Sequence, residues 1–122
     1  MIRIFQKVKK IIEGNYVAFA TADKNCKPNV IAVACVKVIE GGGKIIITDN
    51  FMKHTGENLR ENENVCLAVW NKKEEGHKLI GKAKYFSGGK WLKFVKQMPE
   101  NKGLPAKGAI IITVLKLMKL GG

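Results

Sequence analysis

The 122 residues of this chain include 22 Lys and Arg against 10 Asp and Glu, a formal net charge of +12, and 46% of them are hydrophobic. This hydrophobic content is enough for one packed core and too high for a disordered chain, so we expect a single domain over residues 1–122. The longest apolar run, residues 108–115, is far shorter than the ~20 residues of a membrane span, and the N-terminal residues do not resemble a signal peptide. We therefore expect a soluble, cytoplasmic protein.

The expected elements are six strands and three short helices. Ile4, Val8 and Ile12 have helical spacing, and Gly14 is suited to end that helix. A second short helix is expected to begin near Thr55, and a third over residues 88–98. Runs rich in apolar and β-branched residues predict six strands, over residues 16–22, 29–40, 44–48, 65–71, 77–86 and 108–120.

Tight turns join most of these strands, and glycines 41–43 form one of the expected hairpins. Consecutive short strands with such turns favour an antiparallel arrangement over a parallel α/β sheet. Six strands are sufficient to close or nearly close a small barrel. The predicted fold class is therefore mainly β, a six-stranded antiparallel barrel with short helices.

The cysteines do not predict a disulfide framework or a zinc site. There are three, Cys26, Cys35 and Cys66, with no CxxC pair and only two histidines in the chain. Cys35 and Cys66 fall in predicted strands, where a free cysteine usually packs as a small core residue. Cys26 falls in a turn and is expected to be an exposed thiol without a role.

The stretch DNFMKHTGENLRENENV, residues 49–65, contains a possible anion site. If Thr55 is the N-cap of a short helix, the unpaired N–H groups of the first turn and the side chain of Lys53 would favour a phosphate group. His54 and Asn58 would add two further donors. An ordinary capped helix with a nearby lysine has the same pattern, so the residues alone leave both interpretations open.

Other motifs of cofactor or catalytic sites are missing. The sequence has no GxGxxG, no GxxxxGK[ST], no GxSxG and no HExxH. No pair of carboxylates lies in a strand where a general acid or a metal would use it. The catalytic residues therefore stay unknown, and any chemistry is expected to come from a cofactor.

The order of these segments resembles the pyridoxamine 5'-phosphate oxidase-related split-barrel flavoproteins, especially their small FMN-binding members. The resemblance extends from about Val8 to Leu117 and is most specific in MKHTGENL and ENENV, with weaker support from VAFATADKNCKPNVIAV, KIIIT and AKGAIIITVLKL. It implies a six-stranded split barrel with FMN as cofactor. The residues that it places around the FMN phosphate are Lys53, His54, Thr55 and Asn58. Those that it places around the flavin ring are Val30, Ile31, Ala32, Val33, Ile47, Thr48 and Asp49.

By the same resemblance, the protein is an FMN-binding flavoprotein that acts as an oxidoreductase or electron carrier, with an unknown substrate or redox partner. Pyridoxamine 5'-phosphate is not the expected substrate, because the final KLMKLGG lacks the arginine and histidine that such oxidases carry there. The resemblance also implies a homodimer with FMN at the interface. Trp91, Phe94 and Leu120 are candidate interface residues, although core packing explains the first two equally well.

The sequence is also compatible with two other functions. A small basic β-barrel can bind RNA or single-stranded DNA, but the lysines are scattered, only Arg3 and Arg60 are arginines, and aromatic residues make up 7% of the chain. A haem or flavin sensor without turnover would share the same fold. No membrane association is expected for any of the three.

Overall fold

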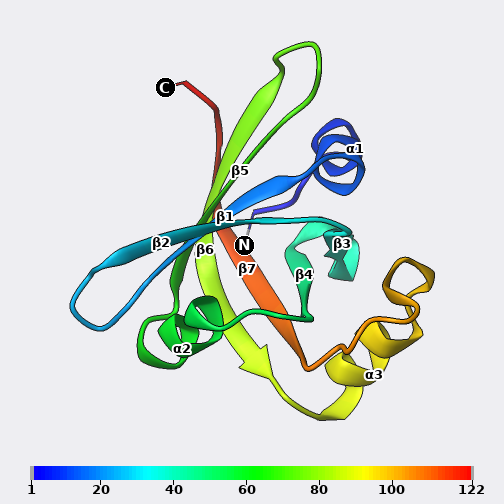
Figure 1. The fold of residues 1–122 in the computed structure, drawn as a ribbon. Coiled ribbons are helices and arrows are strands. Elements are labelled where there is room, and N and C mark those ends of the chain that lie inside the picture. The colour runs from blue at the N-terminus through cyan, green and yellow to red at the C-terminus, as the bar shows by residue number, and fades with distance from the viewer. Residues whose placement is uncertain (1, 122) are drawn as a thin grey trace.

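The computed structural model describes residues 2–121 and consists of one antiparallel sheet with three α-helices around it (Figure 1). Within this part of the chain no helix is long and apolar enough to cross a membrane. The elements are, in chain order, α1 (Gln6–Gly14), β1 (Val17–Ala22), β2 (Pro28–Val33), β3 (Lys37–Ile39), η1 (Glu40–Gly42), β4 (Lys44–Asp49), α2 (His54–Glu61), β5 (Asn64–Trp70), β6 (Gly76–Phe86), α3 (Gly89–Gln97), η2 (Pro99–Asn101) and β7 (Gly108–Lys119).

The seven strands are hydrogen-bonded in the order β2-β1-β5-β6-β7-β4-β3, and every pair is antiparallel. The two edge strands, β2 and β3, are consecutive in the chain. Val33 and Lys37 are four Cα–Cα steps apart, at most about 15 Å of extended chain, so the sheet must roll up until its edges are near each other. The result is a barrel that is split between β2 and β3, and the predicted mainly β, antiparallel split-barrel class is confirmed.

The prediction of one strand over residues 29–40 is wrong, and it explains why seven strands are found instead of six. The chain leaves the sheet after Val33, and Cys35 has a left-handed backbone with φ of 58°. β2 pairs with β1, whereas β3 pairs with β4 on the other edge of the sheet. Val36, between the two strands, is fully buried. The run is uniformly apolar because both strands and their junction contribute to the core.

The main core fills the barrel interior. Alternate residues of each strand point inward, among them Val17, Phe19, Ile45, Leu67 and Ile112, which are at most 1% exposed. α1 covers this core with Val8, Ile11 and Ile12, as its helical spacing predicts. A second cluster lies on the outer face of β4 and β7, where Ile46, Ala109 and Ile111 pack under Val95 and Met98. α3 therefore buries its apolar side on the outside of the barrel.

Two local predictions need correction. α2 begins at His54 with Lys53 as its N-cap, so Thr55 is not the cap but the second residue of the helix, where its side chain is buried. Cys35 is exposed instead of packed in the core, because the left-handed turn takes it out of the strand. Cys66 is half-buried in β5, and Cys26 is exposed in its turn, as predicted.

Candidate functional site

A pocket with a volume of about 420 Å³ lies beside the split in the barrel. We call it the split pocket. One wall is β2 with residues 34 and 35 of the β2–β3 junction. The other is formed by the end of β4, the loop into α2, Glu100 and Asn101 of η2, and Leu104 after η2. The pocket exists because the chain turns away from the sheet after Val33, which separates β2 from β4.

The β2 wall is largely apolar. Ile31 and Val33 pack against the main core, and Ala32 lies on the same edge strand. On the opposite side, Met52 is half-buried and Leu104 is exposed. An apolar slot of this size between two backbone segments can hold a flat ring system, with backbone groups left to meet polar atoms at its rim.

The α2 end of the split pocket is polar and cationic. Lys53 and His54 are exposed there, and Thr55 is buried with its Oγ1 accepting a long hydrogen bond (3.5 Å) from Asn29 Nδ2. The helical hydrogen bonds begin with Glu57 N–H donating to the Lys53 carbonyl at 3.2 Å. The N–H groups of residues 54–56 therefore precede the helical ladder. Unpaired N–H groups, the helix dipole and one ammonium group are together the chemistry of a phosphate site.

A second pocket adjoins the first and shares Asn29 and His54 with it. This helix pocket has a volume of about 600 Å³ and also contains Asn58 and Arg60. Asn58 Nδ2 donates to the buried Thr21 Oγ1 at 3.0 Å, which ties α2 to β1. The structure thus places Asn58 one turn along α2, beside the split pocket and outside its lining.

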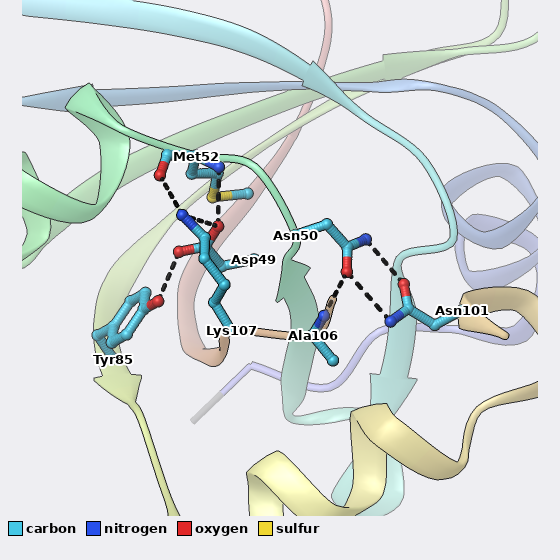
Figure 2. A network of polar contacts seen from close by, with 7 residues as sticks. All are labelled: Asp49, Asn50, Met52, Tyr85, Asn101, Ala106 and Lys107. Carbon is cyan, nitrogen blue, oxygen red and sulfur yellow. Dashed lines mark hydrogen bonds and ion pairs between the residues drawn. The ribbon is translucent and has the colours of Figure 1, made fainter. Parts of the chain in front are cut away.

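The loop that carries Lys53 is anchored by Asp49, the last residue of β4 (Figure 2). Asp49 is 2% exposed; its Oδ1 accepts from Met52 N–H at 2.8 Å and its Oδ2 accepts from Tyr85 Oη at 2.5 Å. Lys107 Nζ lies 3.8 Å from Asp49 Oδ1 and donates to the Met52 carbonyl at 2.9 Å. These contacts fix the start of the loop from three directions. Asp49 supports the pocket wall and does not line the pocket.

Gly108 leaves the space that Tyr85 needs in this arrangement. A Cβ atom on Gly108 would lie 2.3 Å from the Tyr85 hydroxyl oxygen. Any larger residue would therefore displace the ring from Asp49. Gly108 therefore allows Tyr85 to reach Asp49, which in turn holds the loop before α2.

Burial and the hydrogen bond to Asp49 raise the pKa of Tyr85 to about 12 from an ordinary value of 10.0. The folded protein therefore holds this proton more tightly than the unfolded chain. The contribution to stability is complete below about pH 10 and is lost as the pH rises toward 12. We expect the stability advantage of wild type over Tyr85→Phe to be constant below pH 10 and to shrink above it, as measured by urea unfolding from pH 8 to 12. An advantage that persists unchanged to pH 12 would contradict this assignment.

A second anchor joins the split pocket to the segment after α3 (Figure 2). Asn50 and Asn101 exchange two amide hydrogen bonds, of 2.8 and 3.1 Å, and Ala106 N–H donates to Asn50 Oδ1 at 2.9 Å. Both asparagines line the pocket. Glu100, beside them, forms an ion pair with Lys37. The hydrogen bond between these two side chains lowers the pKa of Glu100 and raises the pKa of Lys37.

The structure brings together seven of the eleven residues predicted for the site. Lining the split pocket are Ile31, Ala32, Val33, Thr48, Lys53, His54 and Thr55. Asn58 lines the adjoining helix pocket. Val30 is 63% exposed on the outer side of β2, Ile47 is buried in the main core, and Asp49 holds the loop.

Four further pocket residues were not predicted from the sequence: Asn50, Asn101, Cys35 and Leu104. The Asn50–Asn101 pair spans 51 positions, and no local pattern signals it. Cys35 was missed because the strand break was not recognised. Within residues 2–121 no group of three or more His, Cys, Asp or Glu side chains could hold a metal ion.

Solved structures of other proteins share this fold at low sequence identity. HupZ from Group A Streptococcus superposes with a TM-score of 0.86 at 23% identity, covering 96% of this chain and 94% of that one. An FMN-binding protein from Syntrophomonas wolfei has a TM-score of 0.79 at 19% identity, covering 96% and 86%. An F420 reductase has the same fold, with a TM-score of 0.72 at 15% identity, covering 94% of this chain and 98% of that one. So does HutZ, the haem storage protein of Vibrio cholerae, with a TM-score of 0.70 at 15% identity, covering 97% of this chain and 95% of that one. The last three have names that refer to FMN, F420 and haem, and all four are less than 25% identical to this chain, so their likeness establishes the fold only.

The sequence itself is related to MJ0282 of Methanocaldococcus jannaschii, an uncharacterized protein. The two are 32% identical over 123 residues, which cover 98% of this chain and 83% of the relative. The resemblance found in the sequence is confirmed over the whole barrel. Because the family model described as pyridoxamine 5'-phosphate oxidase matches residues 4–119, from the residues before α1 to the end of β7, this chain belongs to the pyridoxamine 5'-phosphate oxidase family.

Proposed function

We propose that this protein is an FMN-binding flavoprotein that acts as an oxidoreductase or electron carrier. The observation that carries the proposal is the split pocket, in which an apolar slot along β2 ends at the N-terminal turn of α2 and Lys53. A flavin mononucleotide has the matching parts, a flat ring system at one end and a phosphate group at the other. The FMN-binding protein from Syntrophomonas wolfei, with the same fold, adds support.

The residues present fit this cofactor. Lys53 and the N–H groups of the first turn of α2 would hold the phosphate, while Ile31, Ala32 and Val33 would face the ring. Bound FMN supplies hydride or single-electron transfer. The protein's own part is to orient the ring, exclude water from one face and neutralise the phosphate charge. The net charge of +12 favours the approach of an anionic cofactor or substrate.

The pocket provides few groups for acid–base chemistry. Its titratable side chains are those of Cys35, Lys53, His54 and Glu100. Glu100 is paired with Lys37, and Lys53 and His54 belong to the proposed phosphate site. This inventory favours electron or hydride transfer by the cofactor over a reaction that depends on a protein acid or base.

The decisive experiment is titration of the purified protein with FMN. We expect the fluorescence of free FMN to be quenched at a stoichiometry of one FMN per chain and a yellow protein to emerge from a desalting column. A colourless protein that leaves FMN fluorescence unchanged at excess cofactor would contradict the proposal. The same titration with haem tests the competing possibility raised by HutZ, since His54 lies at the pocket and is a possible iron ligand. A Soret band that is lost in His54→Ala would favour haem.

We also propose that the protein is a homodimer. The outer face of β2, β1 and β5 has small side chains in two rows: Ala32, Ala18 and Ala68 are paired across the strands, as are Val30, Ala20 and Cys66. We call this surface the alanine face. Tyr16 and Trp70, 73% and 54% exposed, border it. Small side chains make the surface flat, and exposed aromatic residues at its edge are typical of a protein interface.

The alanine face is adjacent to the split pocket. Ala32 lines both the split pocket and the cavity between Tyr16 and Trp70. A second copy packed on this face would therefore lie against the open side of the cofactor slot. Of the interface candidates from the sequence, Phe94 and Leu120 are each 40% exposed, while Trp91 packs partly against the cluster under α3.

A further inference from the structure

The split pocket has a second polar region, at η2, besides the cationic one at α2. Asn50 follows β4 and Asn101 ends η2, and the side chains of both line the pocket. Asn101 is 5% exposed, so its amide is almost fully removed from solvent. Burial of an amide costs free energy unless its hydrogen-bonding groups find partners. Any hydrogen-bonding capacity that this amide pair leaves unused therefore favours a polar ligand.

A backbone N–H group fixes the orientation of both amides. Ala106 N–H donates to Asn50 at 2.9 Å, and because a backbone N–H can only donate, the accepting atom has to be the amide oxygen Oδ1. Asn101 Nδ2 donates to the same oxygen at 3.1 Å, and Asn50 Nδ2 donates to Asn101 Oδ1 at 2.8 Å. The two amides thus form a closed ring of two hydrogen bonds (Figure 2).

The side of the amide pair away from Ala106 has unused groups. Asn50 Oδ1 already accepts two hydrogen bonds, which fills both of its lone pairs. Asn50 Nδ2 uses only one of its two N–H groups, and Asn101 Oδ1 uses only one of its two lone pairs. Within the described part of the chain neither atom has a second partner. Because these two atoms are bonded to each other, the unused N–H and the unused lone pair lie side by side.

A donor beside an acceptor is complementary to a cyclic amide or imide, in which a C=O lies next to an N–H. The carbonyl of such a ring accepts from Asn50 Nδ2, and its N–H donates to Asn101 Oδ1. The pyrimidine ring of a flavin has this edge, with N3–H between two carbonyl groups. The rim of a haem has carboxylates and no N–H. The amide pair therefore matches a flavin better than a haem.

The backbone holds Asn101 in place before any ligand binds. Its N–H donates to the Met98 carbonyl at 3.0 Å, and its carbonyl accepts from Leu104 N–H at 3.1 Å. Met98 is itself buried in the cluster under α3. The acceptor atom is therefore preorganised, which reduces the conformational entropy that binding a ring would cost.

We propose that Asn50 and Asn101 bind the pyrimidine edge of the flavin, with Asn50 Nδ2 donating to a ring carbonyl and Asn101 Oδ1 accepting from N3–H. This inference rests on the proposed FMN-binding function and adds the residues that select the ring. The apolar side chains of β2 pack on a flat ring but do not distinguish its polar edge. Glu100 also lines this end of the pocket, but its carboxylate is paired with Lys37.

The ratio of the affinities for FMN and N3-methyl-FMN, measured by fluorescence titration, tests the proposal. The methyl group removes the N3–H and leaves the phosphate and both carbonyls unchanged. We expect wild type to bind FMN at least tenfold more tightly than N3-methyl-FMN, because a buried acceptor would lose its partner. In Asn101→Ala the acceptor is absent and there is room for the methyl group, so the two affinities should lie within threefold of each other. A purely structural role of Asn101 would lower both affinities equally and keep the ratio.

The matched control is Leu104→Ala, which shortens another side chain of the pocket lining and leaves the amide pair intact. Its preference for FMN should stay at least tenfold. If Asn101→Ala does not fold, as judged by circular dichroism, Asn101→Ser makes the same comparison with a smaller loss of volume.

Equal affinity of wild type for the two flavins would overturn the inference, and so would a preference for FMN that the Asn101 variant retains. Loss of the preference in Glu100→Ala alone would assign the N3–H to that carboxylate and would also overturn it. Each of these outcomes leaves FMN binding itself in place. A wild-type protein that binds neither flavin would instead overturn the proposed function, and the inference with it.

Discussion

Replacing Lys53 and Thr55 together with alanine is expected to lower the affinity for FMN by between several-fold and several-hundred-fold. Lys53 provides the ammonium group at the N-terminus of α2, and the buried Thr55 provides a hydroxyl in its first turn. Hydrogen bonds to a charged group contribute about 1.5–3 kcal/mol each, and the exposure of Lys53 places its share at the lower end. Fluorescence titration with FMN measures the change directly.

The matched control is Lys53→Arg/Thr55→Ser, which keeps the positive charge and the hydroxyl at the same positions. We expect its FMN affinity to stay within a few-fold of wild type. Circular dichroism spectra should be the same for the control and the alanine variant, because Thr55 Oγ1 makes only a long hydrogen bond to Asn29. An alanine variant that binds FMN as tightly as wild type would place the phosphate elsewhere, with Arg60 of the helix pocket as the next candidate.

The fold was largely predictable because the hydrophobic periodicities are local. The apolar side of α1 and the alternation in β1 and β5 each appear within fewer than ten residues, and the sequence predicts these elements within about two positions. The break between β2 and β3 was not predictable from periodicity. Its residues are as apolar as the strands beside them, and only the left-handed backbone of Cys35 marks it.

The site was predictable where its residues are close in sequence. Lys53, His54 and Thr55 are consecutive, and helix N-terminus chemistry is local. The error in the N-cap arose because Thr55 is the type of residue that caps helices, whereas here it is the second residue of α2 and its side chain is buried in the wall of the split pocket. Asn101 is the last residue of η2, after α3, and its place beside Asn50 depends on how the whole barrel closes.

Wild-type protein is expected to be a homodimer in solution. We expect light scattering to give a mass about twice 13.5 kDa for wild type. The alanine face is the surface expected to be buried, because its flat centre allows close contact and exposed Tyr16 and Trp70 border it. A stable interface buries about 800 Å² on each partner, and three adjacent strands with their bordering aromatics are a surface of that order.

Ala18→Arg is the most direct test, because Ala18 is the central residue of its row, between Ala32 and Ala68. A guanidinium there would be buried without a partner in the dimer but solvated in the monomer, so we expect a mass near 13.5 kDa. The control Ser87→Arg adds the same group at an exposed position after β6 and should leave the dimer intact. Because Ala32 borders both the alanine face and the split pocket, the monomeric variant should also bind FMN more weakly. A wild-type monomer that binds FMN tightly would show that one chain completes the cofactor site alone.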